Sequence, residues 1–196
     1  MKEKRETTKI TTPDGLEITI IAKRHDINAL KEELEDCIED YNVVPEIKTY
    51  VRMIHAQALY DEARGDLVGA ADGLKNRLDI DYDVEFPEHD DFMDPYQLEY
   101  RRAAAYLSGL YLKLGRMEDA LDWGEASFET AHDNFYGTDE IAYAMSTYAN
   151  CFMAAGQDRE ATAYYEAALE EIAIRLNDLE ELAKAVIYNM EQLKKK

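Results

Sequence analysis

Apolar residues recur at helical spacing along most of this chain, and the clearest stretch gives nearly the same pattern twice. The two copies, about forty residues apart, are Tyr106 to Ala131 and Thr147 to Ile172. Each contains an apolar helical stripe, a Gly-centred turn and a second stripe in which the fifth residue after the Gly is Ala. This pattern predicts a repeated helical hairpin. Repeats of this length are typical of stacked arrays, in which neighbouring units bury each other's apolar faces.

The same residue types recur around a third glycine, earlier in the chain. Gly65, Gly115 and Gly156 are each followed five residues later by an alanine, at Ala70, Ala120 and Ala161. A small residue precedes each glycine by seven positions, at Ala58, Ser108 and Ala149. Small side chains at these places let the two helices of a hairpin approach closely, so we expect three helical hairpins.

Residues 1–24 have a different period from the rest of the chain. β-branched residues alternate with others on both sides of Pro13, Asp14 and Gly15. This predicts a β-hairpin, because Pro presets φ for the turn and Gly accepts a positive φ. Since an isolated two-stranded hairpin is marginally stable, it must pack or pair with something. We expect it to cap the first helix; the alternative is an open edge that accepts a strand from a partner.

The other apolar stripes predict further helices and one insertion. The helices are expected at about 26–41, 45–64, 96–114, 117–132, 138–155, 158–177 and 179–194, the last as a cap of the array. Gly65 and Gly115 are 50 residues apart, against 41 for Gly115 and Gly156, so about nine residues are inserted, within 79–97. Insertions in arrays often carry function. We therefore predict an acidic contact loop with Asp79, Asp81, Asp83, Glu85, Asp90, Asp91 and Asp94.

The charge of the chain is strongly negative and unevenly spread. The net charge is −20, and residues 26–191 carry 38 acidic against 13 basic groups. Such a field repels nucleic acid and anionic lipid and speeds encounter with a basic partner. We therefore expect no direct contact with nucleic acid or a membrane. The alternative is that the charge serves solubility alone, with the acidic insert a solvated loop.

No motif in the chain indicates catalysis or metal binding. Cys37 and Cys151 lack CxxC spacing and are expected to be packed thiols, and the four His lack metal-ligand spacing. The insert alternates aspartates as a calcium loop does, but Val84 stands where that loop needs Gly. We expect a protein that is not an enzyme and has no metal or cofactor. Without a membrane-spanning run or a signal-peptide segment, we also expect it to be cytoplasmic.

The residues of the last hairpin match a known repeat. They are Tyr148, Ala149, Phe152, Gly156, Ala161, Tyr164, Tyr165, Ala168 and Leu169, and they resemble the tetratricopeptide repeat (TPR) family in its longer form of about forty residues. The resemblance covers roughly residues 48–177; the second unit departs from it at Gly124, where an aromatic residue is usual. It implies an all-α fold, a TPR-like right-handed array of helical hairpins (an α-α superhelix) over 26–196, after a small N-terminal β-hairpin over 1–24.

In the TPR family the first helix of each unit lines a concave groove that takes a peptide. The resemblance places Arg52, His55, Leu59, Glu62, Arg102, Ala105, Gly109, Leu112, Tyr143, Ser146, Asn150 and Met153 there. The partner-binding candidates among them are Arg52, His55, Arg102, Tyr143, Ser146 and Asn150. Asn150 matches an Asn that holds a peptide's backbone by donor and acceptor, and the alternative is a plain exposed polar residue. The two arginines either pin a partner's carboxylate or balance neighbouring acids.

The resemblance implies a non-catalytic adaptor or regulator that binds another protein or a peptide through the groove and the acidic loop. Two alternatives stay open. One is an acidic inhibitor or nucleic-acid mimic that blocks a basic partner. The other is a small TPR secretion-type chaperone, which would form a homodimer. Salt distinguishes the adaptor from the acidic inhibitor, because a charge mimic loses most of its affinity as the salt concentration rises and an apolar groove loses little.

Overall fold

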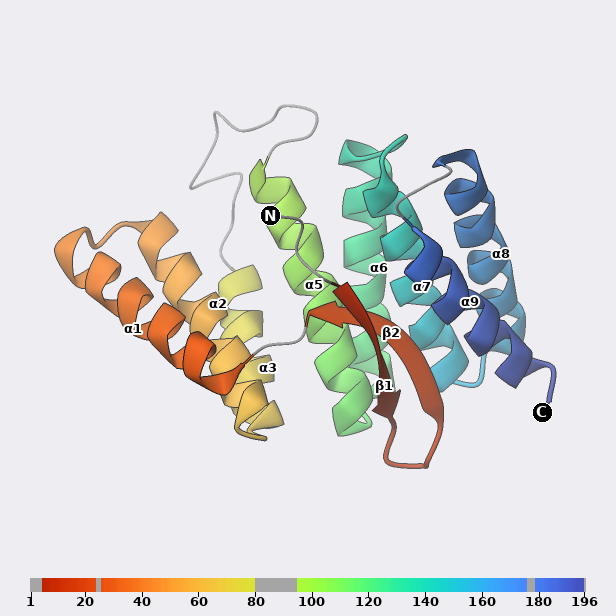
Figure 1. Ribbon diagram of the computed structural model, residues 1–196, viewed down its shortest axis with the longest axis horizontal. Helices are drawn as coiled ribbons and strands as arrows, with labels where there is room; N and C mark the ends of the chain where they lie inside the picture. Colours follow the sequence, from red (N-terminus) through yellow and green to blue (C-terminus); the bar gives the residue numbers. More distant parts are fainter. Residues whose placement is uncertain (1–4, 24–25, 80–94, 176–178, 196) are drawn as a thin grey trace. The chain divides into compact units, whose positions relative to one another are not determined.

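Eight helices and a two-stranded hairpin make up the part of the chain that the computed structural model describes, residues 5–23, 26–79, 95–175 and 179–195 (Figure 1). The strands are β1 (Arg5–Thr11) and β2 (Glu17–Lys23). The helices are α1 (Ile27–Val43), α2 (Ile47–Ala63), α3 (Leu67–Leu78), α5 (Pro95–Leu114), α6 (Met117–Asn134), α7 (Asp139–Ala154), α8 (Asp158–Arg175) and α9 (Glu180–Leu193). The protein is therefore mostly helical with a small N-terminal antiparallel hairpin, as the sequence predicts.

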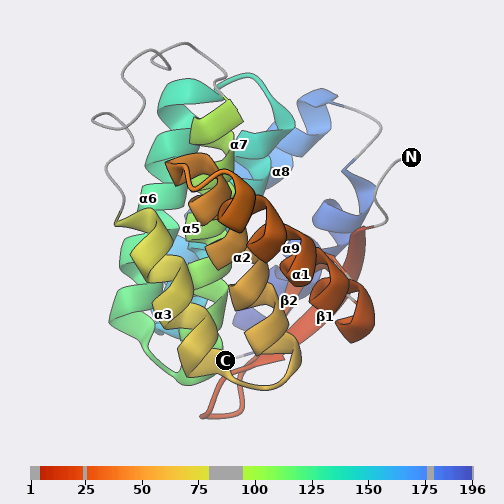
Figure 2. The same ribbon diagram turned by 90° about the vertical axis from the view of Figure 1, so that its left-hand side faces the viewer.

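The chain folds into two compact units. Residues 24–90 form one and residues 1–23 with 91–196 form the other. In the smaller unit α2 packs against both α1 and α3 (Figure 2). In the larger unit the helices pack in chain order, α5 on α6, α6 on α7, α7 on α8 and α8 on α9, with α5 also against α7. The later helices and the hairpin therefore share one unit.

Local signals set the helix ends close to the predicted positions. The side chain of Asp26 caps α1 and accepts hydrogen bonds from the backbone N–H groups of Asn28 at 2.7 Å and Ala29 at 3.3 Å. The helix predicted at 96–114 is α5, from Pro95 to Leu114, and the one predicted at 158–177 is α8, from Asp158 to Arg175. The predicted helices are thus confirmed within a few residues.

Three turns repeat one geometry. Gly65, Gly115 and Gly156 have φ of +86°, +74° and +73°. The N–H of the following residue bonds back to a helix carbonyl at 2.9 Å each time, Asp66 to Asp61, Arg116 to Tyr111 and Gln157 to Phe152, which is the Schellman arrangement. The small residues predicted at the helix crossings, Ala58, Ala70, Ser108, Ala120, Ala149 and Ala161, all have 0% exposure. The three helical hairpins α2–α3, α5–α6 and α7–α8 are confirmed.

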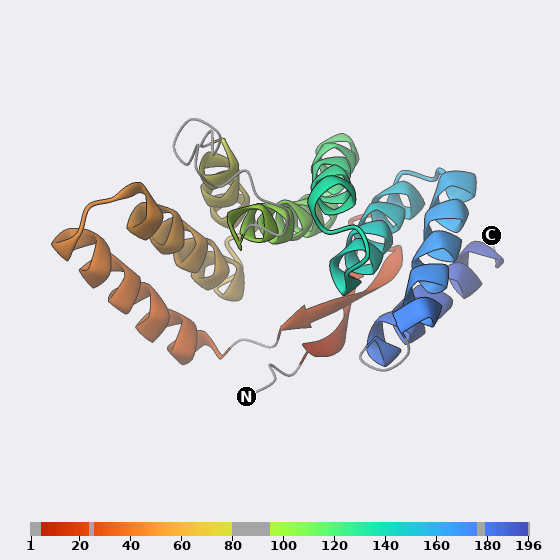
Figure 3. The ribbon, with the colours of Figure 1, turned by 90° about the horizontal axis from the view of Figure 1, so that it is seen from above.

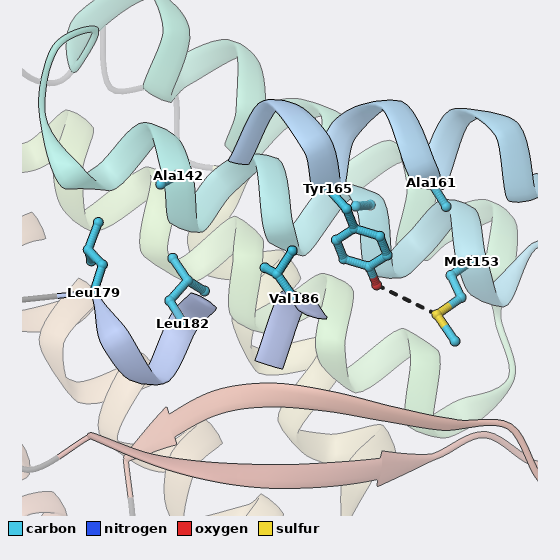
Figure 4. Packing of buried hydrophobic residues seen from close by; sticks show 8 residues of the cluster. Ala142, Met153, Ala161, Tyr165, Leu179, Leu182 and Val186 are labelled. Atoms are coloured by element: carbon cyan, nitrogen blue, oxygen red, sulfur yellow. Dashed lines mark hydrogen bonds between the residues drawn. The ribbon is translucent and has the colours of Figure 1, made fainter. Parts of the chain in front are cut away.

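A core cluster joins α7, α8 and α9. Its buried members are Ala142, Ala149, Met153, Ala161, Tyr165, Leu182 and Val186, together with Leu179, the N-cap residue of α9 (Figure 4). Leu16 and Ile21 of the N-terminal segment are only partly buried and pack against this cluster from outside. The buried members of the cluster therefore all come from the helices and the α9 N-cap, and the hairpin packs against them.

The N-terminal hairpin turns as predicted but packs elsewhere. Lys9 lies opposite Thr19 and Ile10 opposite Ile18, and Gly15 in the turn has the expected positive φ, +90°. The sequence prediction placed the hairpin on the first helix. The structure instead packs β1 against α5 and α9, and β2 against α9 (Figure 3). One physical reason is a hydrogen-bonded contact, because the side chain of Asn189 on α9 meets both backbone groups of Thr19 on β2.

Candidate functional site

Two of the predicted partner-binding residues lie on α2, in the smaller unit. Arg52 is exposed, and its Nη1 atom lies 3.2 Å from Oδ2 of Asp40 on α1. His55 lies on the same helix and is partly buried. Arg52 thus pairs with a neighbouring acid of its own chain, which is one of the two roles foreseen for it.

Arg102 also pairs with an acid of this chain. Its guanidinium lies 2.5 Å from Oε1 of Glu140 on α7, and the Glu140 side chain is only 8% exposed. The other oxygen of Glu140 pairs with Arg101, which is buried as well. One buried carboxylate between two arginines therefore ties α5 to α7. Removing it would leave the Arg101 charge in the interior without that carboxylate, which is strongly destabilising in general.

The three predicted residues on α7 are less accessible than expected. Tyr143 is partly buried, whereas Ser146 and Asn150 are 5% and 4% exposed. The side-chain oxygen of Asn150 accepts hydrogen bonds from the Tyr165 hydroxyl at 2.6 Å and from Nδ2 of Asn189 at 2.9 Å. Both roles foreseen for Asn150, peptide contact or exposed polar residue, assumed an accessible side chain. The structure corrects this, because Asn150 lies in the interior.

Asn189 of α9 holds a strand by its backbone. Its Oδ1 accepts from the N–H of Thr19 at 2.9 Å, and its Nδ2 donates to the Thr19 carbonyl at 3.0 Å. Asn189 is fully buried. Sequence reasoning missed it, although a polar residue between Val186 and Leu193 in an apolar helical stripe is a signal, since buried polar groups need partners.

These contacts form one connected network of buried polar groups. It runs from Thr19 of β2 through Asn189 of α9 and Asn150 of α7 to the hydroxyl of Tyr165 on α8. Burial raises the pKa of Tyr165 well above its usual range, so the hydroxyl stays protonated and donates. A satisfied buried network of this kind fixes the relative positions of the elements that it joins. It therefore positions β2 on the helices.

The hairpin touches α5 and its following turn at two glycines. A Cβ atom on Gly109 would lie 3.9 Å from Cδ1 of Ile10, and one on Gly115 would lie 2.9 Å from Cγ of Pro13. Ile10 is 2% exposed. The fit at Gly115 depends on the missing side chain, whereas a Cβ atom at Gly109 would make an ordinary van der Waals contact. We call the surface formed by Gly109, Gly115, Tyr188 and Asn189, on which the hairpin packs, the docking face.

Exposed polar contacts surround the buried ones. Lys9 Nζ donates to Glu17 Oε2 at 2.7 Å and to the Tyr188 hydroxyl at 3.2 Å, and Thr7 donates to Glu181 at 3.0 Å. The hydrogen bond from Lys9 is the main cause that lowers the pKa of Glu17. The hairpin is therefore held to α9 by a buried amide contact with a solvent-exposed polar margin.

The predicted acidic contact loop falls mostly outside the described residues. Asp79 is the exposed C-cap of α3, whereas Asp81, Asp83, Glu85, Asp90, Asp91 and Asp94 lie in the range 80–94 that the structure does not describe. Within the described ranges, no three His, Cys, Asp or Glu side chains are grouped so that they could hold a metal ion. No helix in those ranges combines the length and apolar character needed to cross a membrane.

Comparison with protein-family models and with curated proteins found no match to this chain. Three features of the chain bear on its function: the three equivalent glycine turns, the buried small residues of the helical hairpins and the docking face that carries the N-terminal hairpin.

Proposed function

We propose that this chain is a non-catalytic, TPR-like adaptor that binds an extended segment of another protein. The observation that carries the proposal is the threefold repeat of one hairpin geometry, with a positive-φ glycine at each turn and fully buried small residues at each crossing. Arrays of such hairpins place their first helices side by side and use the resulting surface to bind partners. In this proposal α5 and α7 are those first helices in the larger unit, where α9 caps the array, and α2 is the first helix of the hairpin in the smaller unit.

The contact between β2 and α9 supports the proposal. Asn189 offers one acceptor and one donor to the backbone of Thr19, which is how a side chain can recognise an extended chain without reading its sequence. The surface is thus chemically suited to an extended backbone.

A second candidate function is an acidic inhibitor that blocks a basic partner. The net charge of −20 favours it, and so does the exposed face of α1. That face carries Glu32, Glu33, Glu35, Asp36, Glu39 and Asp40, all exposed. Such a surface would attract a basic partner through its electric field, and its affinity for that partner would fall strongly as the salt concentration rises.

The test is affinity capture of partners from the native source at about 50 and about 300 mM salt, a range over which surface charges become well screened. The adaptor predicts a partner that is retained at both concentrations. A matched variant with Glu32→Gln, Glu35→Gln and Glu39→Gln should retain the same partner. A partner lost at the higher salt, or lost with the triple variant, would favour the acidic inhibitor and contradict the adaptor.

A further inference from the structure

We propose that the docking face is a strand-binding site which the chain's own β-hairpin occupies until a partner's strand takes its place. The partner segment is an extended, β-branched stretch without net negative charge. This inference rests on the proposed adaptor function, because it names the segment that the adaptor binds and the element that must leave.

The first reason is that the face recognises main-chain atoms. Both groups of Thr19 that meet Asn189 are backbone groups, the N–H and the carbonyl. Any residue except proline offers the same pair. The contact therefore selects for an extended conformation and not for the hairpin of this particular chain.

The second reason is that the hairpin packs against a core cluster whose buried members all come from other elements. The eight buried members of that cluster come from α7, α8 and α9 with its N-cap residue, while Leu16 and Ile21 pack on it only partly buried. Figure 4 shows the two strands passing beside the labelled cluster residues. Departure of the hairpin would uncover the face of α9 and expose the hairpin's own Ile10 and Ile18, while every buried member of this cluster would stay in place.

The third reason is that solvent reaches the margin of the contact. The polar contacts that cross the margin to α9, from Lys9 to the Tyr188 hydroxyl and from Thr7 to Glu181, are both exposed to solvent and contribute little to holding the hairpin. An isolated two-stranded hairpin is itself only marginally stable, so the strands depend on the docking face for their order.

The buried side chains of the hairpin define what a competing strand must carry. Ile10 and Ile18 lie opposite each other and are 2% and 0% exposed, so a replacement needs β-branched apolar residues at such inward positions. Residues 26–191 carry 38 acidic and 13 basic groups, so an acidic strand would be repelled. Residues 5–23 are balanced, with three basic and three acidic groups.

The experiment uses the full chain and a labelled synthetic peptide of residues 5–23. Thr19→Pro removes the N–H group that donates to Asn189. Because both main-chain groups of Thr19 face Asn189, the substitution breaks no hydrogen bond between β1 and β2. Fluorescence anisotropy should show that the Thr19→Pro chain binds the peptide at least tenfold more tightly than the wild-type chain. Adding Asn189→Ala to the Thr19→Pro chain should weaken its affinity for the peptide at least tenfold. A control peptide with proline in place of Thr19 should not bind.

Circular dichroism and hydrogen exchange over residues 17–21 decide between the outcomes. If Thr19→Pro loses its helices, the Ile18→Ala chain replaces it in the same titrations. A hairpin that stays docked in both variants overturns the inference, as does a vacated face that takes up no peptide. Partner capture at two salts is independent of this titration. Retention of a partner by a chain that fails the titration would leave the adaptor function standing without the strand-binding site.

Discussion

The side chain of Asn189 holds both main-chain groups of Thr19, although the two residues are 170 positions apart in the chain. The amide behaves as a neighbouring strand would, with one donor and one acceptor. At this position it covers the outer edge of β2, an edge that would otherwise be open to another chain. The link between the N-terminal hairpin and the last helix is therefore the relationship on which the account depends.

Replacing Asn189 by Ala should loosen the hairpin and lower the stability of the larger unit. The change leaves the N–H and carbonyl of Thr19 without the amide and removes one of the two donors to Asn150. Unmet buried polar groups cost about 1–3 kcal/mol, so the free energy of unfolding in urea should fall by about that amount. Hydrogen exchange at the Thr19 amide should accelerate with it. Glu191→Ala, on an exposed position of the same helix, is the control and should change neither.

Replacing Ala161 by Leu should overpack the α7–α8 hairpin. Ala161 is fully buried in the cluster that contains Met153 (Figure 4). Extra methylene groups in a packed core typically cost about 1–3 kcal/mol. Ala163→Leu, two residues along α8 and exposed, is the matched control and should be nearly neutral. Equal melting temperatures for the two variants would show that the assigned register of this repeat is incorrect.

Gly124→Ala should destabilise the protein although it lies inside a helix. Alanine normally gains about 1 kcal/mol over glycine there. At Gly124, however, the new Cβ would lie 3.0 Å from Cys151 Sγ and 3.2 Å from Tyr148 Cδ2, and Cys151 is fully buried. Gly109→Ala is the control, since its Cβ would meet only Ile10 at 3.9 Å, and it should stabilise by about 0.5–1 kcal/mol. A stabilising Gly124→Ala in thermal unfolding would mean that α6 and α7 approach less closely.

Stability should fall at alkaline pH. Burial raises the pKa of the Cys151 thiol from 9.0 to about 12 and raises the pKa of Tyr165 above its usual 10.0. The folded state therefore keeps these protons after the unfolded chain has lost them. Their contribution to the free energy of unfolding is complete at pH values below the ordinary pKa values. It is lost as the pH rises from about 9 through the pKa values of the folded state, by up to about 1.4 kcal/mol per pH unit for each group.

Thermal melts between about pH 7 and 11 measure this loss. Tyr165→Phe should have a lower melting temperature at neutral pH, because Asn150 loses a donor, and a shallower fall above pH 10. Tyr136→Phe, on a side chain that is 62% exposed, should follow the wild-type curve. If the melting temperature of Tyr165→Phe fell as steeply with pH as that of the wild type, groups other than Tyr165 would cause the loss of stability at alkaline pH.

Local sequence signals account for most of the fold. The cap at Asp26 and the turns at Gly15, Gly65, Gly115 and Gly156 depend on residues within a few positions, and the helix start and the turns lie where the sequence predicts them. Gly124, which departs from the TPR pattern, has a packing reason that only the structure reveals. An aromatic residue there would collide with Tyr148 and Cys151 of the next helix.

The site was harder to predict, because its contacts join distant parts of the chain. The family resemblance pointed to Asn150 as the residue that holds an extended backbone. In the structure Asn150 bonds to the side chain of Asn189, and Asn189 makes the contact with the backbone of Thr19. Nothing near Thr19 in the sequence indicates a partner on the last helix. Pattern and propensity are local, whereas this contact arises from long-range packing.

Competition by the free hairpin peptide shows whether a partner occupies the docking face. A partner captured on the full Thr19→Pro chain at about 300 mM salt is challenged with the synthetic peptide of residues 5–23, and with the control peptide that has proline in place of Thr19. The first peptide should release the partner and the control peptide should not, because the strand and the partner share the docking face. A partner that stays bound at saturating peptide would contradict the account and place the interaction elsewhere on the chain.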